Sequence, residues 1–348
     1  MESSKGSIVM TGANGGLGCA IVRRIISTPE LVRYHGVYLV RDATQATAFK
    51  SLLASAPSSH SYEIISLELC RLTDVREVAR GLKTRIAAGE IPPIRALLLV
   101  AGYTDAGLQL WTDEGYDVAF VSNYLGHWLL TMMLLESMDR EVGRIIIMGS
   151  SSYDVEHPSH SFDGQYVDEK WKLFFRDDNL DAIVHGTWSH NDDPTSLARQ
   201  AGTRRYGVAK MCNVMMIAEL QRRLDADPVL HKLSVVGVDP AVMGTGLLRR
   251  GNFIVSVLMW PIVIPLLAPL LTWLWPNGEI RTTYKSAGDV LAAAFEVGDR
   301  LRGQFLNGSE ILTVVPEAAD EGKRRMIWRD SVRYAKLEEK DTSLAQWK

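Results

Sequence analysis

The feature that most constrains this chain is a glycine-rich turn between a short apolar run and an amphipathic stretch near the N-terminus. The run Ser7–Thr11 leads into Gly12–Gly18, which reads Gly-Ala-Asn-Gly-Gly-Leu-Gly, and a helical pattern covers Gly16–Ser27. Glycines let the backbone approach a pyrophosphate closely, and the start of the helix offers unpaired N–H groups and a positive dipole end. The turn therefore predicts a dinucleotide-binding unit. No Gly-Lys-Ser/Thr follows, which excludes a phosphate-loop NTPase.

Short apolar runs and longer amphipathic stretches continue to alternate along the chain, the pattern of a parallel sheet with helices on both faces. Strands are predicted at Ser7–Thr11, Val37–Val40, Tyr62–Leu67, Ala96–Val100, Arg144–Met148 and Leu233–Val238. Helices are predicted at Gly16–Ser27, Ala43–Ala54, Asp74–Ala88, Asp113–Met138 and Arg204–Leu224. The expected fold class is α/β, a doubly wound parallel sheet of the Rossmann type in a single domain with an insertion and an apolar lid.

The segment Asp154–Asp193 interrupts this alternation with an excess of acidic side chains. It contains ten acidic residues and three basic ones. This composition predicts a solvated surface insertion at about 153–203, and its removal is expected to leave a folded protein. Trp171, Phe174 and Phe175 are the residues that would make it a packed element instead.

The segment Phe253–Pro276 is the opposite, because its 24 residues carry no charge. Its length would suffice to cross a bilayer. Pro261, Pro265 and Pro269 interrupt the helix, however, and unpaired backbone groups are costly in lipid. The segment therefore predicts a broken apolar lid at about 246–280. This lid is compatible with a peripheral membrane contact through 253–276. It is equally compatible with burial within the protein or in a homodimer contact.

The pattern after the lid predicts a helix at Thr282–Val297, a strand near Phe305 and a charged amphipathic helix at Glu317–Lys340. The apolar stripe of the last helix is expected to comprise Met326, Ile327, Val332 and Leu337. The predicted organisation is thus a nucleotide-binding domain over residues 1–300 and a C-terminal strand and helical extension over 301–348.

Composition excludes several other classes of protein. The chain has 38 basic and 41 acidic residues, a formal net charge of −3, which is too balanced for a nucleic-acid-binding protein. Its three cysteines, Cys19, Cys70 and Cys212, lie far apart, which favours a reducing compartment over a disulfide framework or a zinc site. No secretory signal precedes the first strand, so a cytoplasmic protein is expected, with membrane association left open. The insertion's histidines show no metal spacing, and no metal is expected.

The residues that end the second and third predicted strands bear on the choice of cofactor. An arginine after the second strand pairs with a 2′-phosphate, whereas an acid there hydrogen-bonds the ribose 2′-hydroxyl. Arg41 comes first and favours NADP(H) over NAD, while Asp42 could equally be a helix N-cap. Glu68 could accept a hydrogen bond from the adenine amino group or be a solvated loop acid.

Tyr206 and Lys210 form an acid–base pair in the predicted helix Arg204–Leu224. Their i, i+4 spacing places phenol and ammonium on one helix face. A nearby cation favours the phenolate, so Lys210 is expected to bring the pKa of Tyr206 into the working range. Ser150 ends the fifth strand, whose carboxyl end faces the cofactor crevice. Ser151 and Ser152 compete for its role, but Ser150 is preferred because it follows Gly149.

Together these motifs resemble the short-chain dehydrogenase/reductase superfamily, and a fungal-type member with a long insertion before the tyrosine. The resemblance covers roughly Gly6–Ser150 and Arg204–Val297. Its motifs recur in the family's order: the stretch Thr11–Gly18, Ala101-Gly102, Asn123, Gly149-Ser150, Tyr206–Lys210 and Asp239-Pro240.

The resemblance implies a role for each matching residue. Tyr206 would donate or accept the proton, Ser150 would hydrogen-bond the substrate oxygen, and Lys210 would lower the pKa of Tyr206 and hold the nicotinamide ribose. Asn123 would anchor a water that joins Lys210 to a proton relay. Val242 and Thr245 would contact the nicotinamide amide and phosphate region. The expected cofactor site comprises Gly12, Asn14, Gly16, Leu17, Gly18, Arg41, Glu68, Asn123, Tyr206, Lys210, Val242 and Thr245.

Three departures from the family pattern stand out. Val100 takes the place of an asparagine, and Ala241 takes the place of the glycine that commonly follows the proline at Pro240. Ser150 and Tyr206 lie 56 positions apart, more than the family's usual separation. A surface loop absorbs such length at little entropic cost.

The resemblance and the apolar lid together predict an NADP-dependent oxidoreductase, a ketone reductase or secondary alcohol dehydrogenase. Its expected substrate is a lipophilic small molecule such as a polyketide, terpenoid or sterol ketone, consistent with secondary metabolite biosynthesis. One alternative is a 3-ketosteroid or sterol-type reductase. The other is a non-redox protein of the same fold that uses NADP as a scaffold.

Overall fold

The computed structural model describes residues 5–105, 107–161, 164–176, 180–192, 197–245, 263–296 and 298–348. Within them, the middle layer is an eight-stranded sheet of order β3-β2-β1-β4-β5-β6-β7-β8, parallel except for β8. The strands are β1 (Ser7–Thr11), β2 (His35–Val40), β3 (Tyr62–Ser66), β4 (Ile94–Leu99), β5 (Arg144–Met148), β6 (Ser234–Asp239), β7 (Phe305–Asn307) and β8 (Glu310–Ile311). The predicted doubly wound α/β fold is confirmed.

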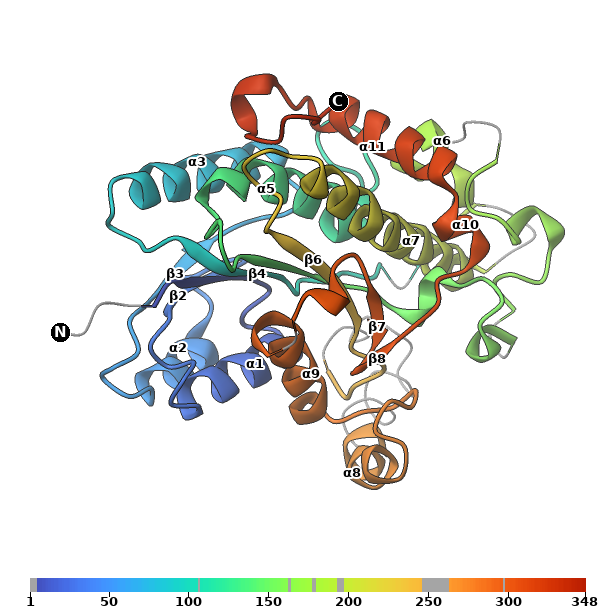
Figure 1. Ribbon diagram of the computed structural model, residues 1–348. Helices are drawn as coiled ribbons and strands as arrows, with labels where there is room; N and C mark the ends of the chain where they lie inside the picture. The colour runs from blue at the N-terminus through green and yellow to red at the C-terminus, as the bar shows by residue number, and fades with distance from the viewer. Residues whose placement is uncertain are drawn as a thin grey trace.

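Helices cover both faces of this sheet (Figure 1). One face carries α1 (Gly16–Ser27), α2 (Thr47–Ala54) and α9 (Thr283–Phe295). The other carries α3 (Leu72–Ala87), α5 (Gly126–Leu134), α7 (Ala198–Asp225) and α11 (Glu321–Ala335). Successive β1 side chains alternate between two cores, Ile8 and Met10 in one and Val9 in the other. The central strands are therefore apolar because both of their faces are buried, whereas the edge strands β3 and β8 carry exposed residues.

The prediction of one continuous helix over Asp113–Met138 is wrong, because the helix begins later and consists of several segments. It consists of α4 (Val118–Phe120), a π-helical turn (Val121–Leu125), α5 and a 3₁₀ turn (Leu135–Ser137). It begins late because the Asp117 carboxylate accepts a hydrogen bond from the Phe120 N–H and caps it. The stretch Val118–Ser137 is long and apolar enough to cross a membrane, but 94% of its most apolar window is buried inside the protein. It is a core element.

The prediction of a solvated insertion is wrong for the apolar residues of that segment. The helix α6 (Leu180–Val184) and several 3₁₀ turns organise it. Its buried side chains join the core on the α7 face: Tyr153, Tyr166, Trp171, Phe174, Phe175, Leu180, Ile183 and Val184. The acidic residues hide this pattern in the sequence, since they are interleaved with the aromatic ones. The segment is a packed element, and its removal would expose the core.

The C-terminal extension is two helices where one was predicted. The helices are α10 (Pro316–Ala319) and α11, separated because the Asp320 side chain accepts a hydrogen bond from the Lys323 N–H and starts a new helix. Trp328 and Tyr334 are buried in addition to the expected Ile327. The extension thus packs on the same core as α7.

The predicted lid is described only in its second half, because 246–262 lie outside the described residues. The helix α8 (Ile264–Leu274) begins there and contains Pro269. It turns Ile264 and Ala268 inward and leaves Leu266, Leu270 and Trp273 exposed. In Figure 1 this helix projects away from the sheet beyond α9.

Candidate active site

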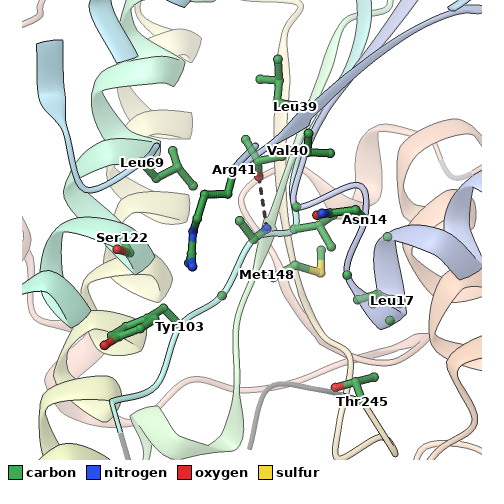
Figure 2. Close-up of a pocket in the computed structure, with 18 of the residues that line it drawn as sticks. Asn14, Leu17, Leu39, Val40, Arg41, Leu69, Tyr103, Ser122, Met148 and Thr245 are labelled. Atoms are coloured by element: carbon green, nitrogen blue, oxygen red, sulfur yellow. Dashed lines mark hydrogen bonds between the residues drawn. The ribbon is translucent and has the colours of Figure 1, made fainter. Parts of the chain in front are cut away.

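A groove of about 600 Å³ opens at the carboxyl ends of the central strands. The predicted site residues that line it come from distant parts of the chain: Gly12, Asn14, Gly16, Leu17, Gly18, Arg41, Glu68, Tyr206, Lys210 and Thr245. Figure 2 shows Arg41 reaching into the groove on the side of Ser122 and Tyr103, with Asn14, Leu17 and Thr245 on the other side. The lining of the groove does not include three predicted site residues, Ser150, Asn123 and Val242.

The glycine loop forms one wall because its backbone meets other backbone at close range. Gly12 has φ +67, and a Cβ atom there would lie 2.7 Å from the Ala101 Cα. A Cβ on Gly16 would lie 2.6 Å from the Thr245 Cγ2, so this loop and the segment after β6 touch. The residue before α1 is Gly15, which has no side chain to cap the helix. The first N–H groups of α1 therefore suit a pyrophosphate.

At the far end of the groove, Arg41 faces Glu68. The Arg41 Nε atom lies 3.2 Å from the Glu68 Oε2, and the arginine side chain is 55% exposed. Asp42 uses its carboxylate locally, since Oδ1 accepts hydrogen bonds from the Thr44 N–H at 2.8 Å and from its hydroxyl at 2.6 Å. These bonds hold the pKa of Asp42 below its usual value. Asp42 thus closes a turn before α2, while the Arg41 side chain extends into the groove.

Ser150 and Tyr206 meet where β5 ends against α7. Burial raises the pKa of the Tyr206 phenol well above its usual value, and a hydrogen bond with Ser150 opposes part of that rise. The Ser150 hydroxyl also donates to the Ser152 Oγ at 3.2 Å. Of the three consecutive serines, Ser150 is therefore in contact with the tyrosine. A raised pKa keeps the phenol protonated at neutral pH, but it also makes the phenol a weaker acid than a free tyrosine.

Lys210 lies one turn further along α7 and is also buried. Its Nζ donates to the Met148 carbonyl at 2.9 Å and lies 5.5 Å from the centroid of the Tyr206 ring. Burial lowers the pKa of Lys210 to about 8, while the negative charge of Asp239 acts in the opposite direction. Burial and Asp239 raise the pKa of Tyr206 and the Ser150 hydrogen bond lowers it, and the expectation that Lys210 lowers it stays a prediction.

Asn123 sits in the π-helical turn behind the groove and is fully buried. Its Oδ1 accepts from the Tyr103 N–H at 2.9 Å, and its Nδ2 donates to the Tyr103 carbonyl at 2.7 Å. Its own backbone carbonyl accepts from the Asn213 Nδ2 at 3.0 Å. The side chain thus fixes the segment after β4 that forms the groove wall.

The turn after β6 carries the second departure from the family pattern. Ala241 has φ +60, a conformation that costs a non-glycine residue about 1–2 kcal/mol. The Asp239 Oδ1 accepts from the Ala241 N–H at 2.8 Å, and the Arg281 guanidinium donates to the Asp239 carbonyl at 3.0 Å. These contacts hold the turn that brings Met243 and Thr245 into the groove.

The sequence analysis missed several groove residues, among them Tyr103, Ser122 and Met243. Two of them carried a usable signal. Tyr103 follows Ala101-Gly102 at the carboxyl end of β4, and ligands bind outside the carboxyl ends of parallel strands. Ser122 directly precedes Asn123. Within the described residues, no group of three or more His, Cys, Asp or Glu side chains could hold a metal ion.

Comparison with known proteins places the chain among dehydrogenases. Residues 7–162 match the family model described as short chain dehydrogenase. The short-chain dehydrogenase iccH of Talaromyces variabilis is 42% identical over 99% of this chain and 100% of that protein. Retinol dehydrogenase 13 of Homo sapiens is 26% identical over 95% of this chain and 85% of that protein.

Solved structures agree with this at the level of the fold. The angucycline C-6 ketoreductase LanV with bound NADP has a TM-score of 0.57 and 19% identity, covering 88% of this chain and 96% of that one. An NADPH-bound carbonyl reductase from chicken fatty liver has a TM-score of 0.57 and 14% identity, covering 90% and 97%.

Proposed function

This chain belongs to the short-chain dehydrogenase/reductase family, and we propose that within it the protein is an NADP(H)-dependent ketone reductase or secondary alcohol dehydrogenase. The observation that carries the proposal is the meeting of Ser150 and Tyr206 where β5 ends against α7, with Tyr206 and Lys210 lining a groove that the glycine loop also lines. The fit of that loop to a pyrophosphate rests on the close backbone approach at Gly12 and Gly16.

In the proposed reaction NADP(H) supplies or takes a hydride at the nicotinamide C4. In the direction of reduction, Tyr206 donates its hydroxyl proton to the carbonyl oxygen of the substrate, and Ser150 hydrogen-bonds the same oxygen. Lys210, charged below its pKa of about 8, holds the nicotinamide ribose. Asn123 is proposed to anchor a water that joins Lys210 to a proton relay. These groups act by position and electrostatics.

The proposed cofactor is NADP(H) in preference to NAD. Arg41 extends into the groove, and a guanidinium recognises a 2′-phosphate through charge-assisted hydrogen bonds. Asp42, the competing ribose ligand, is engaged with Thr44. Two proteins of the same fold are bound to NADP or NADPH. Arg41 contacts Glu68 through its Nε, and the Nη groups of the same guanidinium suit a 2′-phosphate.

The proposed substrate is a lipophilic ketone of secondary metabolism. LanV is named as an angucycline ketoreductase, which supports a polycyclic ketone. The apolar α8 follows the groove segment that ends at Thr245, where a lid over the substrate would begin. The same features allow the narrower alternative, a 3-ketosteroid or sterol-type reductase. We propose the domain division given above, with the lid at 246–280 and the extension at 301–348.

The exposed α8 also supports a peripheral membrane contact for a cytoplasmic protein. Trp273 is 77% exposed and Trp275 61%, and tryptophan suits the membrane interface. Release of the protein from membranes by salt or carbonate supports this contact. Release only by detergent would show an integral segment, and a fully soluble dimer would assign the same surface to a second copy.

Loss of NADPH absorbance with a panel of lipophilic ketones tests the proposed activity. We expect turnover with at least one bulky ketone and none in Tyr206→Phe, which lacks only the transferable proton. NADPH binding should survive in that variant, whereas Lys210→Ala should lose both rate and cofactor affinity. If the protein binds NADPH but neither reduces any ketone nor oxidises any alcohol, the result would favour the non-redox scaffold.

A further inference from the structure

We propose that Arg205, directly before Tyr206, is a positioning residue that ties the catalytic tyrosine to the insertion and to the segment after β4. The proposal rests on the proposed function, because it assigns what holds the proton donor of that reaction in place. Arg205 is not among the residues that line the groove. It acts through its neighbour in α7.

The Arg205 guanidinium contacts three parts of the chain at once. It donates to the Asp105 Oδ2, at 2.6 Å from Nη2 and 3.1 Å from Nε. It donates to the Ser189 carbonyl, and to the Asn191 Oδ1 at 2.9 Å. Its Nε also lies 3.3 Å from the Asp117 Oδ2. One planar cation thus joins α7, the segment after β4 and the insertion.

The setting of these groups makes the contacts rigid. The side chains of Arg205, Asp105 and Asp117 are 3%, 2% and 1% exposed. One guanidinium faces two buried carboxylates, so the loss of Arg205 would leave both of them in the interior without this cation. The planar fork reaches several acceptors in a fixed geometry, which the single ammonium group of a lysine does not reproduce.

Asp105 and Asp117 connect this cluster to the groove. Asp105 lies two residues after Tyr103, a residue of the groove wall. Asp117 caps the helix that leads into the π-helical turn with Asn123. A shift of Arg205 is therefore expected to move the tyrosine and the Tyr103 segment of the groove together.

The insertion also contacts α7 at Arg204 and Gly207, the residues on either side of Arg205-Tyr206 in the sequence. Arg204 donates to the Ser189 Oγ at 2.8 Å and the Gln165 carbonyl at 2.9 Å. A Cβ on Gly207 would lie 2.6 Å from the Ser152 carbonyl oxygen and would clash with the Tyr166 hydroxyl. The extra length between Ser150 and Tyr206 is therefore a scaffold for the tyrosine, with Arg205 as its charged centre.

The test compares Arg205→Lys with Arg222→Lys on the same helix. Lysine keeps the charge that faces Asp105 and Asp117 but loses the fork, so the protein should fold. Arg222 pairs with Glu219 at the far end of α7 and is 45% exposed. A shift of about 1 Å in a reacting group costs up to about a hundredfold in rate. We expect kcat to fall between about tenfold and a hundredfold in Arg205→Lys.

The accompanying readouts separate positioning from stability. In Arg205→Lys the Kd for NADPH should stay within about twofold, because a remote contact adds little to uniform binding. The isotope effect with deuterated NADPH should rise, since the chemical step becomes slower. Arg222→Lys should change none of these. A kcat and isotope effect equal to wild type in folded Arg205→Lys, with only a lower Tm, would overturn the proposal.

Two further measurements keep the test decisive. If Arg205→Lys does not fold, Asn191→Ala removes one acceptor while the ion pairs stay, and an unchanged kcat there overturns the proposal. Hydrogen exchange of the peptide spanning residues 200–210 needs no activity. It should be faster in either variant than in wild type, and equal exchange would overturn the proposal even in an inactive protein. The proposed function itself fails when the wild type reduces no ketone or Tyr206→Phe retains activity.

Discussion

The cofactor groove and the insertion meet at Tyr206, but they are built in different ways. The groove depends on the glycines of one short motif, since the missing side chains of Gly12 and Gly16 let Ala101 and Thr245 come close. The insertion is held by side chains whose partners lie far away in the sequence, such as the Phe174 N–H that bonds to Glu317 at 3.1 Å. A sequence motif predicts the glycine contacts of the groove, whereas no motif predicts the contacts of the insertion.

Two arginines show the same contrast. Arg41 pairs with Glu68 while 55% exposed, whereas Arg205 pairs with Asp105 while 3% exposed. An exposed pair contributes little to stability, and its arginine can change partners. A buried pair fixes the chain around it, because breaking it leaves a charge in the interior. Substitutions in the groove should therefore change ligand binding, and substitutions in the insertion should change folding.

The largest effect is expected in the insertion. Phe174 is fully buried there, and Phe174→Ala should lower the free energy of unfolding by about 3–5 kcal/mol through a cavity. Val167 in the same segment is 73% exposed, so Val167→Ala should stay within about 0.5 kcal/mol of wild type. Urea denaturation measures both. If both variants lose less than about 0.5 kcal/mol of unfolding free energy, the insertion is solvated, as its acidic composition predicts.

A smaller effect, on binding only, is expected at the groove. Arg41→Ala should weaken NADPH binding by about 1.5–3 kcal/mol, the contribution of a charge-assisted contact. NADH binding and the free energy of unfolding should barely change, because the arginine is exposed. Calorimetric titration with both coenzymes decides the matter. Equal losses for NADPH and NADH would move the specificity away from Arg41.

The pH dependence should follow Lys210, which lines the groove. Its pKa is lowered to about 8, and a lysine is charged below its pKa. Reduction should therefore slow as pH rises above about 8, approaching tenfold per pH unit. Lys210→Arg keeps its charge and should move this falling limb to higher pH. A wild-type profile that stays flat to pH 10 would show that the lysine charge is not needed.

The smallest effect is expected at Ala241, which has φ +60. Ala241→Gly should relieve the strain and stabilise the protein by about 1 kcal/mol, less the entropy that glycine loses on folding. Ala292→Gly, inside α9, should instead destabilise the protein by about 1 kcal/mol. Thermal unfolding of the two variants gives the signs. A lower Tm in Ala241→Gly would mean that Asp239 and Arg281 leave no strain to relieve.

The sequence predicted the groove better than the rest because its signals are local. The bounds of β1, α1 and β5 match those predicted, since a glycine turn or an apolar run marks each end. The start of α4 was missed because the Asp117 cap overrides the helical pattern before it. The packing of the insertion was missed because its contacts, such as Phe174 with Glu317 and Gln165 with Arg204, join residues distant in the sequence, and acidic composition predicts only exposure.

Transfer of deuterium from NADPH labelled at C4 to a ketone tests the central claim most directly. The account predicts deuterium at the carbinol carbon of the product formed by the wild type, with no product from Tyr206→Phe under conditions where that variant still binds NADPH. Product without the label, or labelled product from Tyr206→Phe at the wild-type rate, would contradict it.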